Sequence, residues 1–309
     1  MFRFAICVFC GTFVSLIQAE EVPASRVLWI GLDGCRPDAL LKAETPHLDS
    51  LKKTGAWSYA TKIQGKRYQK SDTSSGPGWS SFLTGVWADK HGVNDNSFEG
   101  RQYDKYPHVF QRIKERWPTA FTASFVDWEP IDKYIVESCD LKVCYPAHGT
   151  DQYAANDVLL ARAAAECLRE QNPSAMMVYF GAIDETGHAS GFHPDNSDYI
   201  AAIQTVDERV GEVLTALQSR NKFDSEKWLV IVSTDHGGKG KAHGGGQNEP
   251  EIVTTFMIIS GEGVQPGKIA QQTYLVDVPA TGLAYLGLNI DPAWKLDGKP
   301  VGLNLDVSP

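Results

Sequence analysis

The sequence predicts an α/β protein: a single domain with a central, mostly parallel sheet and helices on both faces. The first observation is a set of short, continuous apolar runs, which are typical of strands buried on both faces. The second is that segments with helical patterns lie between these runs, as in a parallel or mixed sheet. The third is composition: 309 residues, 42% hydrophobic and 22% charged, fit a globular chain and exclude a collagen, a coiled coil and a disordered protein.

Four apolar runs predict the strands of this sheet. They are residues 27–32, 176–180, 228–233 and 253–259. Two longer segments predict helices, because residues 151–170 are rich in Ala and Leu and residues 195–220 repeat apolar residues at steps of three and four. Residues 55–100 are instead rich in Gly, Ser, Asp and Trp, which predicts a functional loop with a short helix.

The first 19 residues have the pattern of a secretory signal peptide. Arg3 precedes a short apolar stretch, and the small residue Ala19 precedes two glutamates. A helix that spans a bilayer needs about 20 apolar residues, so a retained anchor is the weaker alternative. We therefore expect residues 1–19 to be removed, and residues 20–309 to form a secreted or periplasmic domain with no stable membrane anchor.

Four cysteines remain after this cleavage: Cys35, Cys139, Cys144 and Cys167. Export allows disulfides to form, and Cys139 and Cys144 are close enough in sequence to close a small loop. Four unpaired thiols are the equally supported alternative. No two of the four have CxxC spacing, so a thiolate zinc site is not expected.

The chain is acidic, with 29 Lys and Arg residues against 38 Asp and Glu and a formal net charge of −9. It therefore lacks the basic surface that general nucleic-acid binding or anionic-membrane binding requires. If the substrate is an anion, its attraction must come from a local positive centre. A bound metal ion is the first candidate for that centre.

Polar residues follow three of the predicted strands, at the edge of the sheet where ligands bind in such folds. Each of them alone is more often a helix cap or a surface group. Together they form a mixed carboxylate and imidazole set of the kind that zinc accepts, and a pair of metal sites fits phosphoryl transfer. The set is Asp33, Asp184, His188, Asp235, His236 and His243.

A series of motifs in fixed order carries a family resemblance. They are Gly31-Leu32-Asp33-Gly34, Thr45-Pro46-His47-Leu48-Asp49, Thr84-Gly85-Val86-Trp87, Lys90-His91-Gly92-Val93, Asp184-Glu185-Thr186-Gly187-His188, Ser233-Thr234-Asp235-His236-Gly237-Gly238 and His243-Gly244. The series resembles the alkaline phosphatase superfamily and, within it, the type I phosphodiesterase/nucleotide pyrophosphatase branch. The resemblance covers nearly the whole of the predicted mature chain and implies an alkaline-phosphatase-like fold.

The resemblance also implies two divalent metal ions per chain, expected to be zinc, and a hydroxyl nucleophile. By position, one ion would be held by Asp33, Ser75, Asp235 and His236, and the other by Asp184, His188 and His243. The nucleophile of this branch lies two residues before a loop proline, which points to Ser75 before Pro77, with Ser74 and Thr73 as alternatives. A serine hydroxyl is a weak nucleophile near neutral pH unless a base or a metal ion activates it.

The nucleophile loop departs from the family at one position. The diesterases commonly carry an Asn that contacts the phosphate where this chain has Gly78. We therefore expect the backbone N–H of Gly76 to help hold an oxyanion, with Gly78 and Trp79 beside the substrate. Trp79, Trp87 and Trp128 are placed in loop regions near the mouth of the site. Core packing is the default role for these side chains, and stacking of one of them on a substrate is the alternative.

The function predicted from these observations is an exported two-metal phosphohydrolase that cleaves phosphodiester or pyrophosphate bonds of a small-molecule phosphate ester through Ser75. A phosphomonoesterase and a sulfatase-like hydrolase are the enzymatic alternatives. The sulfatase motif requires an Arg where this chain has Trp79. A non-catalytic binding protein that keeps the fold is a further alternative, although all six side-chain ligands are present. The natural substrate and the oligomeric state stay open.

Overall fold

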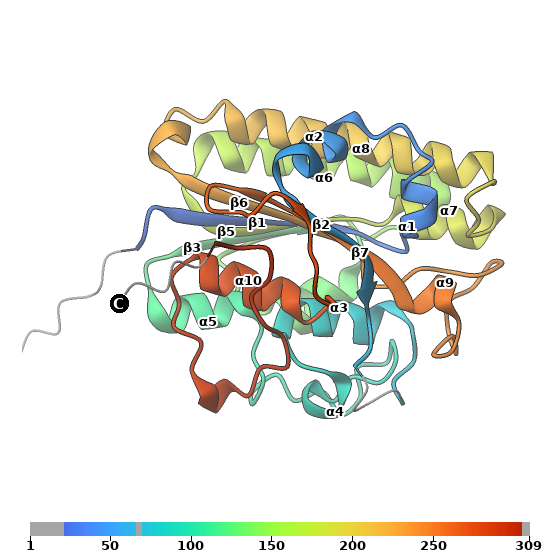
Figure 1. Cartoon of the computed structure of the whole chain (residues 1–309), viewed down its shortest axis with the longest axis horizontal. Helices are drawn as coiled ribbons and strands as arrows, with labels where there is room; N and C mark the ends of the chain where they lie inside the picture. Colours follow the sequence, from blue (N-terminus) through green and yellow to red (C-terminus); the bar gives the residue numbers. More distant parts are fainter. Residues whose placement is uncertain (1–21, 66–69, 305–309) are drawn as a thin grey trace, which may run out of the picture.

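The computed structural model describes residues 22–65 and 70–304, so the predicted signal peptide at residues 1–19 lies outside the described residues. One eight-stranded sheet forms the middle layer, and helices cover both of its faces (Figure 1). The order across the sheet is β4 (Leu141–Cys144), β3 (Phe121–Val126), β5 (Pro173–Phe180), β1 (Ser25–Leu32), β6 (Lys227–Ser233), β7 (Thr254–Gly261), β2 (Ala56–Lys62) and β8 (Gly267–Lys268). The structure confirms the predicted fold class.

The four predicted strands correspond to β1, β5, β6 and β7. β5, β1 and β6 are parallel neighbours at the centre of the sheet, so their carboxyl ends lie at the same edge. β7 runs antiparallel to both of its neighbours, β6 and β2. The sheet is therefore mostly parallel, with one reversed strand in its described part.

The helices divide between the two faces of the sheet (Figure 1). Those on the upper face are α1 (Pro37–Leu40), α2 (Pro46–Thr54), α6 (Thr150–Glu170), α7 (Ala182–Ser190) and α8 (Ser197–Gln218). Those on the lower face are α3 (Ser75–Thr84), α4 (Ala88–His91), α5 (Val109–Arg116) and α10 (Asp277–Tyr285), and the short α9 (Pro250–Val253) lies at the right of the view. A π-helix spans Ile131–Ile135, and 3-10 turns span Phe223–Ser225 and Pro292–Trp294. The two long helices predicted from the sequence are α6 and α8.

The central strand β1 sends its side chains into two hydrophobic clusters, which explains why its sequence is apolar throughout. Leu28 and Ile30 belong to the cluster that includes α6 and α8, whereas Val27 and Trp29 belong to the cluster that includes α3, α5 and α10. All four side chains are fully buried. The carboxyl end of β1 therefore lies between two packed layers.

Residues 55–100 differ from the predicted loop with one short helix, because they begin with β2 and contain both α3 and α4. Two of the buried side chains in β2, Ser58 and Thr61, are hydroxyls rather than apolar groups. Thr273 Oγ1 lies 2.9 Å from Ser58 Oγ and 2.8 Å from Thr61 Oγ1. Hydrogen bonds between these hydroxyls satisfy the buried polar groups. Because these positions are polar, β2 lacks the kind of apolar run by which β1, β5, β6 and β7 were predicted.

The four cysteines among the described residues are free thiols. Of the two alternatives, disulfides and unpaired thiols, the structure therefore shows unpaired thiols. Burial raises the pKa of the Cys139 thiol to about 12 and that of the Cys167 thiol to about 11. Such thiols stay protonated at neutral pH and are poor nucleophiles.

No helix within residues 22–65 and 70–304 combines the length and the hydropathy that a membrane span requires.

Candidate functional site

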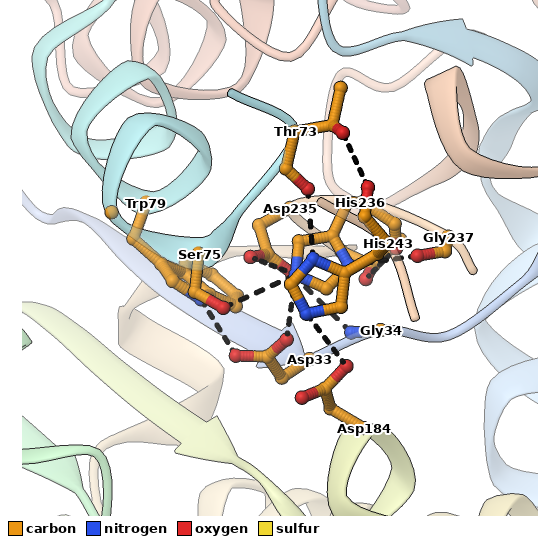
Figure 2. Close-up of polar contacts among 12 residues, drawn as sticks. Asp33, Gly34, Thr73, Ser75, Trp79, Asp184, Asp235, His236, Gly237 and His243 are labelled. Atoms are coloured by element: carbon orange, nitrogen blue, oxygen red, sulfur yellow. Dashed lines mark hydrogen bonds and ion pairs between the residues drawn. The ribbon is translucent and has the colours of Figure 1, made fainter. Parts of the chain in front are cut away.

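Three neighbouring strand ends bring the predicted ligands together (Figure 2). Asp33 directly follows β1, and Asp235 and His236 follow β6 after one intervening residue. Asp184 lies in the first turn of α7, which begins just after β5, and His188 lies on the same helix face one turn later. Because β5, β1 and β6 are parallel neighbours, these side chains meet at one edge of the sheet, as predicted.

The first group of candidate ligands is fully buried. His236 Nε2 lies 3.5 Å from Asp33 Oδ1 and 3.2 Å from Asp235 Oδ2. One ligand atom from each of these three residues lies within 4.8 Å of the other two, a spacing at which they could hold one metal ion. The structure thus brings together the three side chains that, with Ser75, the family resemblance assigns to one ion.

The second group lies beside the first and is more open. His188 Nε2 is 3.3 Å from Asp184 Oδ2, and His243 Nε2 is 3.8 Å from Asp184 Oδ1. Ligand atoms of Asp184, His243 and His236 also lie within 4.8 Å of one another, so His236 stands between the two groups. The hydrogen bond with Asp184 raises the pKa of His188 to about 9. At neutral pH the metal-free ring therefore holds a proton that a metal ion would displace.

The three histidine rings are oriented in the same way. In each ring Nδ1 is 2.9 to 3.0 Å from a backbone carbonyl oxygen, and Nε2 faces the carboxylates. The carbonyls belong to Lys241 for His188, Gly237 for His236 and Thr73 for His243. Metal-binding histidines show this pattern, because the carbonyl fixes the Nδ1–H tautomer and leaves the Nε2 lone pair for the metal.

The carboxylates fit a divalent cation. Asp33 Oδ1, Asp184 Oδ1 and Asp235 Oδ2 are buried and have no hydrogen-bond donor among the described residues. Burial, together with neighbouring carboxylates, raises the pKa of Asp33 and of Asp235 above the usual range. Asp33 Oδ1 and Asp235 Oδ2 lie 3.5 and 3.2 Å from His236 Nε2. Lone pairs that face one another at these distances require a positive charge between them. Three carboxylates and three imidazoles are a donor set that zinc accepts.

Ser75 occupies the first position of α3 rather than a loop. Its Oγ lies 3.2 Å from His236 Nε2, at the edge of the first group (Figure 2). Of the two alternative hydroxyls, Thr73 Oγ1 donates to the His243 carbonyl and accepts from Gly246 N, so it is already occupied. Ser74 Oγ is buried without a partner among the described residues. Ser75 is therefore the hydroxyl in contact with the candidate ligands.

The structure places Trp79 differently from the prediction. It lies in the second turn of α3 and is fully buried, so its expected position in a loop at the mouth of the site is wrong. Its indole N–H donates to Asp33 Oδ2 at 3.0 Å, beneath the candidate ligands. Trp87, just before α4, is also buried, whereas Trp128 is half-buried beside Phe98. Core packing, the default role expected for these side chains, therefore holds for Trp79 and Trp87.

Gly76 and Gly78, which were predicted to lie in a loop beside the substrate, lie in α3 and have structural roles there. A Cβ on Gly78 would lie 2.8 Å from Asp235 Cβ, so glycine is needed for α3 to approach the site. The N–H of Gly76 donates to Asn96 Oδ1 at 2.7 Å. This N–H, which was expected to help hold an oxyanion, is thus already hydrogen-bonded in the structure. A side-chain amide lies beside Gly76, at Asn96, and sequence reasoning missed this residue. An Asn in the turn that follows the Lys90-His91-Gly92-Val93 motif was the available signal.

Comparison with known proteins identifies the family of the chain. The family model described as type I phosphodiesterase/nucleotide pyrophosphatase matches residues 27–241, which is more than half of the chain. The chain belongs to this family. The matched segment includes Asp33, Ser75, Asp184 and Asp235 and ends just before His243.

Curated relatives of this phosphodiesterase-family chain are distant and longer. GPI ethanolamine phosphate transferase 1 of Schizosaccharomyces pombe is 24% identical over 270 residues, which cover 80% of this chain and 28% of the relative. Ectonucleotide pyrophosphatase/phosphodiesterase family member 3 of Rattus norvegicus is 25% identical over 231 residues, which cover 68% of this chain and 24% of the relative. The chain therefore spans about a quarter of the length of these two proteins.

Solved structures show the same fold. BT1596, described as a 2-O GAG sulfatase, matches with a TM-score of 0.70 at 16% identity, over 89% of this chain and 73% of that chain. Murine ectonucleotide pyrophosphatase/phosphodiesterase 5, solved as an inactive variant in complex with AMP, matches with a TM-score of 0.61 at 15% identity, over 87% of this chain and 96% of that chain. The family's fold is thus the alkaline-phosphatase-like fold that was predicted.

Tyr179 is a second donor to Asp33 that sequence reasoning missed, and it gives a testable prediction. Its hydroxyl donates to Asp33 Oδ2, the oxygen that also accepts from Trp79. Tyr179→Phe removes this donor at nearly constant volume, so we expect zinc affinity to fall about tenfold while the fold is kept. A zinc titration with a competing chelator measures this. Tyr103→Phe is the control, because the Tyr103 hydroxyl contacts Ser80 Oγ rather than a candidate ligand. Equal zinc affinities for the two variants would contradict the role of Tyr179.

Proposed function

We propose that this chain is an exported two-metal phosphohydrolase that cleaves phosphodiester or pyrophosphate bonds of small-molecule substrates, with Ser75 as the nucleophile. The single observation that carries the proposal is the position of Ser75 Oγ. It lies 3.2 Å from His236 Nε2, the same atom that faces Asp33 and Asp235. A hydroxyl at the edge of a divalent-cation site can be activated there and can attack a phosphorus atom held by the same site. Export rests on the signal-peptide pattern of residues 1–19.

The residues that would hold the ions fall into two sets. Asp33, Asp235 and His236, with Ser75 Oγ, form one set, and Asp184, His188 and His243 form the other. When bound, two divalent ions, zinc by the donor set, supply Lewis-acid stabilisation of charge on the phosphoryl, attacking and leaving oxygens. The buried carboxylates that lack donors support this assignment.

The chain's own groups orient the substrate around Ser75. Because Ser75 begins α3, the phosphoryl group that it attacks would lie at the positive end of this helix. Asn96 Oδ1 is occupied by the Gly76 N–H, so the Nδ2 hydrogens of its exposed carboxamide remain as donors for a phosphoryl oxygen. Ser75 Oγ then gives up its proton to solvent and forms a bond to phosphorus while the bond to the leaving oxygen breaks, and the leaving oxygen takes up a proton from solvent. Water later cleaves the phosphoseryl ester, which releases the phosphate product and returns a proton to Ser75 Oγ.

The sulfatase alternative is weakened by Trp79. The sulfatase motif has an Arg at this position, whereas this side chain is buried and donates to Asp33. Arg36, a cation behind the site, is buried and already bonded to Asp38 and to the carbonyls of Phe192 and Gly238. Neither group can contact a sulfate or a phosphate.

The same lack of cations favours a diester over a monoester. A monoester dianion needs more positive charge than a diester monoanion, and no Lys or Arg contact of Ser75, Gly76 or Asn96 occurs among the described residues. Three basic residues precede the nucleophile segment. Lys70 is exposed, whereas Lys66 and Arg67 lie outside the described residues.

We therefore expect a higher kcat/KM for an aryl phosphodiester than for the monoester with the same leaving group, and little aryl sulfatase activity. The measurement is steady-state kinetics of the zinc-loaded protein on the paired substrates. An alcohol acceptor is included, because one relative is named a phosphate transferase. A monoester preference of tenfold or more would place the enzyme among phosphomonoesterases. Absence of turnover on every ester, with two zinc ions bound, would favour the binding-protein alternative.

A further inference from the structure

Two buried carboxyl groups lie behind the candidate metal site and take no part in the proposed mechanism. Asp127 directly follows β3 and Asp157 lies on α6, and they are 1% and 2% exposed. Both meet at Gly181, the residue between β5 and α7. Asp157 Oδ1 accepts a hydrogen bond from Gly181 N at 3.2 Å, and a Cβ on Gly181 would lie 3.0 Å from Asp127 Oδ1. Each carboxyl group also shifts the pKa of the other, as neighbouring groups do.

Most oxygens of this pair lack a hydrogen-bond donor. Asp127 Oδ1, Asp127 Oδ2 and Asp157 Oδ2 have none among the described residues. Two adjacent carboxylates that are both ionised and buried would repel each other and would also lose their hydration. A positive charge must therefore lie between them, either a proton or a metal ion.

The chemistry of the pair favours the proton. Calcium takes six to eight oxygen ligands and magnesium six, whereas two carboxyls offer four oxygens and one of these already accepts from Gly181 N. No third His, Cys, Asp or Glu joins the pair in a metal-binding group among the described residues. A single proton needs only one donor oxygen and one acceptor oxygen.

The surroundings decide which carboxyl holds the proton. Asp157 accepts from the start of α7, where the helix dipole favours a negative charge. Among the described residues neither oxygen of Asp127 has a hydrogen-bond donor, and burial together with repulsion from Asp157 raises the pKa of Asp127 well above the usual range. A protonated Asp127 would donate to Asp157 Oδ2 and give that oxygen its partner.

Other titratable and charged groups around the pair leave the proton on Asp127, because Arg209 favours the charged form of Asp157 and Asp33 disfavours the charged form of Asp127. They are Tyr153 on α6, Tyr179 on β5, Asp33 after β1, Cys144 on β4 and Arg209 on α8. Arg209 is the cation of this set, and it pairs with Glu208 and Glu212.

We propose that Asp127 and Asp157 share one proton, and that the resulting pair caps α7 and so positions Asp184 and His188 for metal binding. α7 begins at Ala182, so Asp184 lies in its first turn and His188 one turn further. A shift of the helix start would move both ligands together. The positioning of Asp184 and His188 for metal binding rests on the proposed function, whereas the shared proton does not.

The chain offers a matched control for this arrangement. Asp207 on α8 is 1% exposed and caps α2 in the same manner, since its carboxylate accepts from His47 N at 3.1 Å and from Leu48 N at 2.9 Å. Both of its oxygens have donors, and α2 carries none of the candidate metal ligands. Its loss should cost stability but should not affect the metal site.

The shared proton is tested by counting protons released on unfolding of the metal-free protein at pH 7, by calorimetry in two buffers of different ionisation enthalpy. An unfolded aspartate is ionised at this pH, so unfolding should release about one proton more from the wild type than from Asp127→Asn. Asparagine keeps the shape and donates through Nδ2. Because a raised pKa means that the native state binds more protons, wild-type stability should fall relative to Asp127→Asn as pH rises above about 4.

Equal proton release from the two proteins would overturn the shared proton. A third divalent ion that the wild type binds and Asp127→Asn loses would overturn it as well, and would make the pair a cation site.

The positioning role is tested by zinc titration with a competing chelator. We expect Asp157→Ala to weaken zinc binding at least about tenfold and Asp157→Asn, which keeps an acceptor for Gly181 N, to restore most of the affinity. Asp207→Ala should lower the melting temperature without changing zinc affinity. Unchanged zinc affinity in folded Asp157→Ala would overturn the positioning role. A wild type that binds no divalent ion would overturn both this role and the proposed function, while the proton count would still decide the shared proton.

Discussion

Ser75→Ala is expected to lower kcat by at least about 10³-fold, the scale for loss of a covalent nucleophile. Ser75 Oγ is the hydroxyl that contacts His236 Nε2, and the hydroxyl contributes little to the fold because Ser75 is held in α3 by its backbone. Most of the metal should be kept, since six other ligands remain. The measurements are single-turnover and steady-state kinetics on an aryl diester, with elemental analysis of the variant.

The control for this prediction is the neighbouring hydroxyl. Ser74 Oγ has no partner among the described residues, so Ser74→Ala should stay within a few-fold of wild type. Thr73→Ser keeps the hydroxyl that bonds the His243 carbonyl and Gly246 N and should also remain active. A nearly wild-type Ser75→Ala together with an inactive Ser74→Ala would mean that the nucleophile has been placed on the wrong residue.

The ligand positions could be predicted because they depend on a property of the whole sheet. Fully apolar runs identify strands buried on both faces, and parallel neighbours place their carboxyl ends side by side. Asp33, Asp184 and Asp235 follow three such runs, so their convergence needed no knowledge of individual contacts. The family resemblance supplied the order of the motifs and the division of the ligands between two ions.

The position of Trp79 could not be predicted in the same way. All ten residues of α3 are buried, so the helix has no solvent-exposed face. Its sequence therefore shows no amphipathic period from which the start of the helix could be predicted. Its Gly- and Ser-rich sequence is typical of a loop. Only the packing of α3 against the end of β1, where a Cβ on Gly31 would lie 2.4 Å from the Trp79 ring, shows why glycine and tryptophan occur together there.

The residues that support the candidate ligands could not be predicted from the sequence either. Tyr179 donates to Asp33 from 146 positions away, and Asp157 caps a helix that starts 25 positions later in the chain. Such pairs have no local spacing pattern, because they are set by the neighbour order of β5 and β1 and by the packing of α6 beside α7. A lone Tyr or Asp in a strand or helix is otherwise compatible with many roles.

Removal of divalent ions is expected to abolish activity and to lower thermal stability. Without a cation, the carboxylates of Asp33, Asp184 and Asp235 face one another with three buried oxygens that lack donors. Each ion that binds only the native state stabilises it by about 4 kcal/mol at a thousandfold excess over its dissociation constant. Chelation followed by dialysis should therefore lower the melting temperature, and zinc should restore both the melting temperature and the turnover.

The stoichiometry makes this prediction specific to the two-ion arrangement. Elemental analysis of active protein should find two divalent ions per chain. His243→Ala should lose the ion of the second group, because this ring and Asp184 face each other at 3.8 Å, and should retain the ion between Asp33 and Asp235. Active protein with less than one ion per chain would rule out metal-dependent catalysis. A single ion that His243→Ala does not disturb would restrict the catalytic centre to Asp33, Asp235, His236 and Ser75, where the nucleophile already lies.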